Sequence, residues 1–422
     1  MKKSLSQTPI GVLPSDWRLC KLGEVIERIG RPVQVEDSRS YVQIGIRSHG
    51  KGIFHKDPVQ GLELGAKSVF WIEPDRLVLN IVFAWEQAVA RTTVKEIGTI
   101  GSHRFPMYRP KTDVSGTPLV DIDYVLAYLL TKRGTELLQE SSPGGAGRNK
   151  TLGQELFLSH IIPVPPLSEQ RHIVAILSSC DRVIELKRKL LERKKVQKSA
   201  LMQTLFVMTR TRQGCTSHSK AHETLFRDCV AFLRNNTYSR AAMTSMDGVA
   251  NIHYGDVLVK YGEILDFSVE EVPSLLPGTG LGGDELKDGD VIIADTAEDE
   301  TCGKTVEISN LGSRQAVAGL HTIACRPKQG LFVPGWLGCY MNSISFHRQI
   351  VPLMAGIKVL SISRTALQGT TVSIPSLAEQ RNAVSVLSAA DREMNLLARE
   401  VEEWKEKKKA LSQLLLSGKV RV

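Results

Sequence analysis

Apolar residues recur at alternating steps of three and four along two long stretches of the chain. This spacing is typical of a helix that packs along one seam against another helix. Neither stretch contains Pro or Gly after its first turn, so each predicts a helix of about 38 residues, about 57 Å long. The apolar seam residues are Leu177, Ile184, Leu191, Leu201 and Leu205 in the first stretch, and Leu387, Met394, Val401, Leu411 and Leu415 in the second.

The two stretches are copies of one repeat. Residues 162–206 and 372–416 align without a gap at an offset of 210, and 18 of the 45 positions are identical. Both copies begin with prolines that stop a strand, and a glutamate, Glu169 or Glu379, then falls in the first helical turn. The chain is therefore predicted to be a tandem duplication, in which each half is a variable part followed by the shared segment.

The charges of the two copies differ in a way that favours their pairing. Residues 181–199 carry eight basic and three acidic side chains, whereas 391–409 carry six of each. We expect the acidic side chains of the second copy to face the basic run 187–195 in an antiparallel coiled coil; they are Glu400, Glu402, Glu403 and Glu406. Lys198 and Lys408 interrupt the seam at the same step and would fix its register. The alternative is that each helix only covers its own domain.

The variable parts are predicted to be two mixed α/β domains, so the fold class is α+β with a pseudo-two-fold tandem repeat. Short amphipathic openings at 13–29 and 224–233 precede strand-like alternation at 40–46 and 251–259. Segments 75–85 and 286–296 occupy similar places, and glycine-marked loops at 144–150 and 354–358 precede the prolines. The expected boundaries are 1–164 and 208–374 for the domains, and 165–207 and 375–422 for the helical regions.

Composition and net charge exclude several classes of protein. Hydrophobic residues make up 42% of the chain, which excludes wholesale disorder. A net charge of +9 suits a polyanionic partner. Seven cysteines without a Cys-x-x-Cys pair fit a reducing cytoplasm, and neither a secretory apolar region nor an 18-residue apolar run is present. We therefore expect a cytoplasmic protein without a membrane partner.

A search for catalytic patterns yields no convincing set. Gly278-x-Gly280-x-x-Gly283 follows prolines rather than a strand, so it predicts a turn and not a dinucleotide site. A nuclease pattern starting at Pro74-Asp75 lacks the downstream Glu-x-Lys. Zinc-like spacing occurs in a linker rich in polar residues, where coincidence is the favoured interpretation; it involves Cys215, His218, His222 and Cys229. The expectation is a non-catalytic chain without a metal.

The residue types that read DNA are present on predicted loops and strands. Arg, Lys, Asn and His side chains contact base edges and phosphates, and glycines allow close approach. In the first domain the candidates are Arg47, His49, Lys51, Lys56, Arg148, Asn149 and Lys150. In the second domain they are Lys260, Tyr261, Lys304, Lys358 and Arg364. The alternative for each is a solvated surface residue. His103 and His321 are expected to be packed or hydrogen-bonded in the core.

The doubled segments PVPPLSEQ and SIPSLAEQ, each followed by a long helix, and the ending LLLSGKVRV resemble the specificity subunit of Type I restriction–modification systems. This resemblance implies two target recognition domains that each read one half of a split, asymmetric double-stranded DNA site, with the helices setting the spacer. It also implies docking of two methyltransferase subunits, and of restriction subunits that form an ATP-dependent translocase-nuclease. S-adenosylmethionine, ATP and magnesium would belong to those partners, so no cofactor is expected in this chain.

Two other functions remain open at this point. A stand-alone DNA-processing enzyme would modify or cut DNA without partners. A protein-interaction scaffold would show neither sequence-dependent DNA binding nor a loss of affinity with rising salt. The first domain resembles the sequence segments of the family's recognition domains only in outline. This is expected if the two domains read different half-sites.

Overall fold

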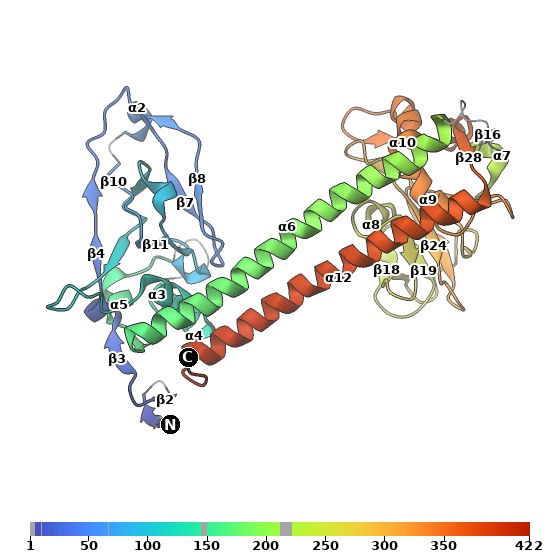
Figure 1. Cartoon of the computed structure of the whole chain (residues 1–422). Helices are drawn as coiled ribbons and strands as arrows, with labels where there is room; N and C mark the ends of the chain where they lie inside the picture. Colours follow the sequence, from blue (N-terminus) through green and yellow to red (C-terminus); the bar gives the residue numbers. More distant parts are fainter. Residues whose placement is uncertain (1–4, 10, 66, 145–149, 212–221) are drawn as a thin grey trace. The chain divides into compact units, whose positions relative to one another are not determined.

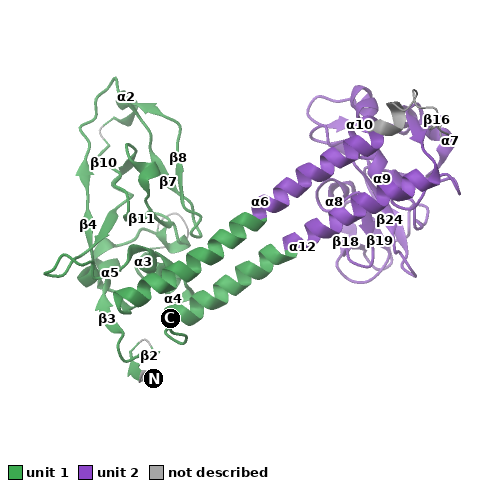
Figure 2. Cartoon of the chain, in the orientation of Figure 1, with its two compact units in different colours: residues 1–187, 399–422 green, residues 188–398 purple. Residues whose placement is uncertain are grey.

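The computed structural model describes residues 5–9, 11–65, 67–144, 150–211 and 222–422, with side chains omitted for 207–211. Figure 1 shows two long helices, α6 (Leu167–Thr211) and α12 (Leu377–Leu416). The chain forms two compact units, residues 1–187 with 399–422 and residues 188–398 (Figure 2). The division therefore crosses both helices, whereas the domains expected from the sequence end where the helices begin.

The first unit is built from short strands and helices around a four-stranded antiparallel sheet of order β12-β11-β14-β4. A three-stranded sheet has the order β13-β10-β5. The strands of the first unit are β1 (Leu5–Thr8), β2 (Gly11–Pro14), β3 (Arg18–Lys21), β4 (Ile26–Ile29), β5 (Arg31–Pro32), β6 (Ser40–Tyr41), β7 (Ile44–Ile46), β8 (Ile53–His55), β9 (Val59–Gln60), β10 (Val69–Trp71), β11 (Leu77–Leu79), β12 (Val89–Arg91), β13 (Ile100–Ser102), β14 (Met107–Pro110) and β15 (Ile161–Val164). Its helices before α6 are α1 (Leu22–Val25), α2 (Gly61–Leu64), η1 (Ala84–Glu86), η2 (Val94–Glu96), α3 (Ile122–Leu129), α4 (Lys132–Glu140) and α5 (Gln154–Ser159).

The second unit has a five-stranded sheet of order β17-β26-β22-β24-β20 and a four-stranded sheet of order β18-β21-β19-β25. Its strands are β16 (His222–Leu225), β17 (Val230–Leu233), β18 (Met243–Thr244), β19 (Ala250–Ile252), β20 (Ile264–Asp266), β21 (Ser274–Leu275), β22 (Val291–Ala294), β23 (Thr296–Ala297), β24 (Thr305–Ser309), β25 (Ala316–Ala318), β26 (Thr322–Pro327), β27 (Leu360–Ser361) and β28 (Thr371–Ile374). Its helices before α12 are α7 (Phe226–Cys229), η5 (Arg240–Ala242), α8 (Tyr254–Val259), α9 (Trp336–Met341), α10 (Ile344–Ile350), η6 (Val351–Leu353) and α11 (Arg364–Gln368).

The two units share the order of four strands in one sheet, so the duplication extends beyond the helices. In the first unit β3, α1 and β4 follow one another, β15 pairs with β3 and β14 pairs with β4. In the second unit β16, α7 and β17 repeat this pattern, with β28 on β16 and β26 on β17. Next to β14 and β26 lie β11 and β22, which come from segments 75–85 and 286–296. These two segments do occupy equivalent places.

One strand expected from the sequence is wrong in part. The alternation across 251–259 gives a strand only at β19, and from Tyr254 to Val259 the chain is the helix α8. His253 caps this helix, because its side chain accepts a hydrogen bond from the Gly255 backbone N–H at 3.2 Å. Within α8 Val257 is fully buried whereas Val259 is 85% exposed, so helical packing replaces the two-sided pattern of a strand from Tyr254 onward.

Within each unit α6 and α12 run antiparallel, as ion pairs between them show. In the first unit Lys408 contacts Asp181 at 2.6 Å and Lys187 contacts Glu400 at 2.5 Å. In the second unit Lys194 contacts Glu393 at 2.8 Å, and Lys198 contacts Asp391 at 2.6 Å. In both units the residue number on α12 falls as the residue number on α6 rises. The antiparallel helix pair is confirmed.

The expected contacts of three glutamates are wrong, because these side chains pair along their own helix. Glu402 contacts Lys405 at 2.5 Å, Glu403 contacts Lys407 at 3.7 Å, and Glu406 contacts Lys409 at 4.0 Å. Their positions lie away from the seam, where a side chain reaches a lysine three or four residues ahead more easily than the other helix. Of the four glutamates, Glu400 alone has an ion pair with α6 among the described residues.

The helices also complete the cores of the two units. In the first unit Leu177 of α6 and Leu415 of α12 join the core of strands and short helices. In the second unit Phe206 of α6 and Leu387 of α12 do the same. None of the ten seam residues is exposed. Each unit thus packs the start of one long helix and the end of the other, so helix pairing and covering of the domain occur together.

A glutamine present in both copies of the repeat ties each helix start to its unit. The Gln170 side-chain amide donates to the Pro165 carbonyl at 2.8 Å, and its oxygen accepts from the Asp121 N–H at 2.7 Å. In the second copy Gln380 donates to the Pro375 carbonyl at 3.0 Å and accepts from the Val333 N–H at 2.8 Å. Both glutamines are fully buried. The shared Pro-to-Gln spacing therefore has a structural cause.

A buried carboxyl makes the second unit sensitive to pH. Glu307 of β24 is 3% exposed and accepts hydrogen bonds from the Gly335 and Gly338 N–H groups, and burial raises its pKa to about 7. Its stabilising contribution is complete below its unfolded pKa of about 4.3 and is lost as pH rises through about 7. Between pH 5 and 8 the wild type should lose about 2 kcal/mol of unfolding free energy relative to Glu307→Gln. Urea unfolding of both proteins at the two pH values measures this difference, and equal pH dependence would contradict it.

Candidate nucleic-acid interface

The β7–β8 hairpin of the first unit presents three of the candidate DNA-contacting side chains. Its connecting residues 47–52 carry Arg47, His49 and Lys51, and all three are exposed. Arg47 donates a backbone hydrogen bond to the Gly52 carbonyl at 3.0 Å, and its guanidinium lies 4.8 Å from the centre of the Phe54 ring. The hairpin therefore carries a compact cationic tip.

Hydrogen bonds connect the hairpin tip, residues 47–52, to η1 of the first unit. The Ser48 hydroxyl donates to the Glu86 carboxylate at 2.9 Å, and the His49 N–H donates to the Glu86 carbonyl at 2.7 Å. His49 has a φ of 60°, in the left-handed region that non-glycine residues rarely adopt. These contacts join the backbone of the tip to η1, while the Arg47, His49 and Lys51 side chains remain exposed.

Lys150 lies beside the same anchor. Its ammonium is 4.9 Å from the centre of the Trp85 ring, and Trp85 directly precedes Glu86 in η1. The structure therefore brings Lys150 and the hairpin tip together from distant parts of the sequence. Lys56 is exposed just beyond β8, whereas Arg148 and Asn149 lie outside the described residues. Trp85 was not expected from the sequence, although an aromatic ring between basic segments is typical of nucleic-acid surfaces.

Two candidates in the second unit have structural roles instead. Tyr261 is 2% exposed and belongs to a hydrophobic core, so the expectation of a surface contact is wrong. The Lys304 ammonium donates to the Leu258 and Tyr261 carbonyls at 2.9 and 3.0 Å, and burial lowers its pKa. Lys304 therefore stabilises the end of α8 rather than reaching a ligand. Lys260 is exposed, but its ammonium donates to the Glu271 carbonyl.

The remaining candidates of the second unit border a different surface. Lys358 is exposed in the loop before β27, where the neighbouring Ile357 is fully exposed. Arg364 is exposed as well, but its guanidinium donates to the Leu233 carbonyl at 2.8 Å. Because β27 pairs with β23, the Lys358 loop emerges next to Thr296.

Two histidines expected in the core are exposed. His103 lies in the turn after β13, and the side chain of His321 is 48% exposed. The His321 ring has its Nδ1 3.4 Å from the Thr296 hydroxyl, and it meets the Tyr254 ring edge-on at 5.3 Å. His321 also has a left-handed backbone, with a φ of 54°. It therefore belongs to the surface beside the Lys358 loop, which sequence reasoning assigned to the interior.

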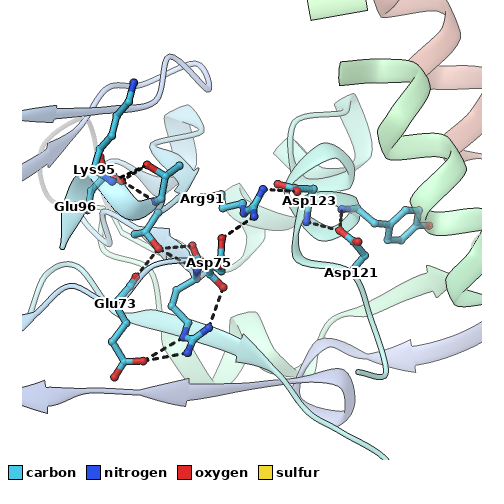
Figure 3. Close-up of polar contacts among 11 residues, drawn as sticks. Glu73, Asp75, Arg91, Lys95, Glu96, Asp121 and Asp123 are labelled. Carbon is cyan, nitrogen blue, oxygen red and sulfur yellow. Dashed lines mark hydrogen bonds and ion pairs between the residues drawn. The ribbon is translucent and has the colours of Figure 1, made fainter. Parts of the chain in front are cut away.

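The acidic residues around Asp75 are neutralised by arginines. Arg91 lies between two carboxylates, 2.6 Å from Asp75 and 2.7 Å from Asp123 (Figure 3). Glu73 contacts Arg76 at 3.1 Å. A guanidinium thus occupies the space between the two aspartates, where a metal ion would have to bind. The network instead joins β12 to the start of α3.

The zinc hypothesis is covered only in part by the described residues. Cys215 and His218 lie outside them. His222 is exposed in β16, whereas Cys229 is buried in α7, and burial raises its thiol pKa to about 11. A raised pKa disfavours the thiolate that binds zinc. No group of three or more potential ligands occurs in the part of the chain that the structure describes.

Within the described ranges, no helix is both long and apolar enough to span a membrane. Even the two long helices carry charged side chains along their length.

Comparisons with known proteins agree on one family. Residues 85–193 match the family model of the Type I restriction modification DNA specificity domain. The chain is 22% identical to the Type I restriction enzyme MjaVIII specificity subunit of Methanocaldococcus jannaschii, over 97% of this chain and 94% of that protein. It is 21% identical to the putative MjaX specificity subunit of the same organism, over 100% and 97%.

Solved structures share the fold. The HsdS subunit from Thermoanaerobacter tengcongensis matches with a TM-score of 0.52 and 19% identity, over 97% of this chain and 98% of that one. A chain from a structural study of complex assembly and conformational transition in a type I R-M system matches with a TM-score of 0.63 and 18% identity, over 97% and 99%. The similarity thus extends over both units.

Proposed function

Since this chain belongs to the family of Type I restriction–modification specificity subunits, we propose that it reads a bipartite, asymmetric DNA site. Each unit would read one half of the site. The long helices would set the unread spacer between the halves and dock the methyltransferase subunits.

The main support for this proposal is that the two units share part of their sheet structure but present different surface side chains. Four strands of one sheet have the same order in both units, β4-β14-β11-β12 and β17-β26-β22-β24, yet the first unit presents the anchored tip 47–52 and the second presents the Lys358 loop beside His321. Different side chains on equivalent scaffolds are what two unlike half-sites require. The net charge of +9 supports attraction to the DNA backbone.

The proposed role leaves the chemistry to partner subunits. Two methyltransferase subunits would bind S-adenosylmethionine and modify adenine, and restriction subunits would use ATP and magnesium. This chain would act in the cytoplasm, without a cofactor or catalytic residue of its own. The arginine that separates Asp75 from Asp123 supports this view, because it removes one place for a catalytic metal.

Two alternatives have distinct signatures. A stand-alone DNA-processing enzyme would act on DNA as the purified chain alone. A scaffold with incidental positive charge would bind DNA without sequence preference or not at all.

The proposed function is tested by selecting bound fragments from a randomised DNA library with the chain in complex with its methyltransferase subunits. Enrichment of two short sequences at one fixed separation supports the proposal, and enrichment of no sequence contradicts it.

The hairpin tip gives a more local prediction. Replacing Arg47 and Lys51 together by alanine should weaken DNA binding about 30-fold or more, because each contact to a base or phosphate is worth about 1–3 kcal/mol and the two together are worth about 2 kcal/mol or more. Sequence preference should relax in one half-site and remain in the other. Fluorescence anisotropy with DNA carrying changes in either half measures both effects. Lys132→Ala, an exposed lysine on α4, is the matched control and should bind as the wild type does.

A further inference from the structure

The segment 353–359, which leads from η6 into β27, exposes three apolar side chains. Ile357 is 100% exposed, Val359 is 49% exposed and Leu353 is 41% exposed. Single exposed apolar residues are common on protein surfaces, but three within seven positions make a local apolar patch. We call residues 353–359 the apolar turn. Its exposed side chains contribute little to the core of the second unit, so folding does not explain why they are apolar.

The backbone of the apolar turn is closed by hydrogen bonds. The Ala355 N–H donates to the Ser361 carbonyl at 2.9 Å, and the Ser361 N–H donates to the Ala355 carbonyl at 2.8 Å. Gly356 has a φ of 125°, and a Cβ at this position would overlap the backbone of the turn, so the turn requires glycine here. On either side, Met354 and Leu360 pack against a hydrophobic core. The exposed side chains are therefore carried by a short loop with both ends anchored.

Cationic and aromatic side chains belong to the same surface. Lys358 is exposed directly after Ile357. Because β27 pairs with β23, Ser361 lies opposite Thr296, whose hydroxyl is 3.4 Å from His321 Nδ1. The apolar turn thus combines an exposed isoleucine with a lysine and lies next to the exposed histidine. Proteins that bend DNA insert apolar side chains between bases and hold the flanking phosphates with basic ones.

We infer that Ile357 is a wedge, which inserts between two neighbouring base pairs of the half-site read by the second unit and kinks the DNA there. This inference rests on the proposed function and goes beyond it, because the chain then deforms its DNA as well as reading it. Apolar wedges such as Ile, Leu, Met and Phe partly unstack one base step and kink the duplex by about 20–90°. Lys358 contacts a phosphate beside the opened step.

The size of the apolar turn favours DNA over a protein as its partner. A stable protein interface takes about 20–30 residues from each side. Insertion into a base stack takes a single side chain, and the turn offers one that is fully exposed. The net charge of +9 also brings the chain to a polyanion rather than to an apolar protein surface.

The wedge adds a sequence preference that needs no hydrogen bond to a base. Pyrimidine–purine steps such as TA and CA unstack and kink most easily, so insertion costs least at one of them. The sites selected by the wild type should therefore contain such a step in or next to the second unit's half-site. A variant without the wedge should accept other steps at that position.

The experiment measures DNA bending and base unstacking in the complex of the full chain with its methyltransferase subunits. A duplex with the selected site carries a fluorophore at each end, and energy transfer between them reports the bend. In a second series, 2-aminopurine replaces one purine at a time, and its fluorescence rises where a step is unstacked. The wild type should bend the duplex by about 20° or more and raise the fluorescence at one step. Ile357→Ala should lose most of both signals, whereas Ile357→Leu should keep them, since leucine also serves as a wedge.

The matched control is Val269→Ala, which removes an exposed apolar side chain elsewhere in the second unit. Val269 is 65% exposed and follows β20, whose last residue lies beside Ser309. The apolar turn lies near the Ala294 end of β22, which is the opposite end of the same sheet. This control should bend and unstack the DNA as the wild type does. Any signal that the methyltransferase subunits cause is common to all variants and cancels in the comparison.

The outcomes separate the wedge from the proposed function. If the wild type binds the selected site without bending it, or if Ile357→Ala bends it equally, the wedge is wrong while the proposed function stands. If Ile357→Ala instead loses methyltransferase subunits from the complex, the turn contacts protein and the wedge is also wrong. If no site can be selected, the proposed function fails. Because Ile357 is fully exposed, its variants should unfold at the wild-type midpoint temperature, which excludes misfolding as the cause of a lost signal.

Discussion

Replacing Lys198 with alanine should destabilise the second unit by about 3–5 kcal/mol. Lys198 is 7% exposed, and its ammonium contacts Glu263 at 2.5 Å and Asp391 at 2.6 Å. Burial alone lowers the pKa of Lys198, but the two carboxylates raise it above its ordinary value. Removing the lysine would leave two negative charges facing each other at the seam. Urea unfolding gives the loss of free energy, and hydrogen exchange of peptides from 377–398 locates it.

The duplication supplies a matched control for this prediction. Lys408 is the repeat equivalent of Lys198, and it pairs with Asp181, the equivalent of Asp391. Here the side chains are 32% and 59% exposed, so solvent screens the pair. Lys408→Ala should therefore cost less than about 1 kcal/mol. Equal losses for the two alanine variants would show that burial and Glu263 do not distinguish the sites.

Lengthening both long helices should lengthen the unread spacer of the DNA site. Seven residues inserted after Leu190 in α6 and after Leu396 in α12 keep the seam in register and preserve the ion pairs on either side. Seven helical residues add about 10.5 Å, which corresponds to about three base pairs of duplex. The selected or methylated site should keep both half-sequences and gain about three unspecified base pairs.

The control inserts seven residues into α6 alone. The inserted residues cannot be matched along α12, so this variant should lose stability or activity rather than shift the spacer. A double insertion that remains active with the original spacer would contradict the proposal that the helices set the spacer length. A double insertion that changes either half-sequence would contradict the separation of reading from spacing.

The helical part of the fold follows from the sequence because its signal is long and repeated. Five apolar seam positions of the first helix recur in the second at the same offset, and chance alternation does not persist over so many turns. The partners of individual charges were less predictable. Glu400 reaches Lys187 on the other helix, whereas Glu402 finds a lysine three residues ahead, and this choice depends on the face each side chain occupies.

The candidate interface was predictable only where residues are neighbours in sequence. Arg47, His49 and Lys51 occur within one short loop, so their grouping is visible in the sequence and recurs in the structure. Tyr261 lies next to the exposed Lys260 but packs into a core formed by residues distant in the sequence, such as Leu286 and Ile308. The contact between Lys150 and Trp85 depends on tertiary packing, and no local pattern reveals it.

We propose above that this chain gives a methyltransferase complex a split DNA specificity. The most direct measurement is to co-express the chain with its methyltransferase subunit and to map methylated adenines across the host genome. We expect one motif with two short specified halves and a spacer of constant length. A complex that forms but methylates no motif, or one that methylates a single continuous motif, would contradict it.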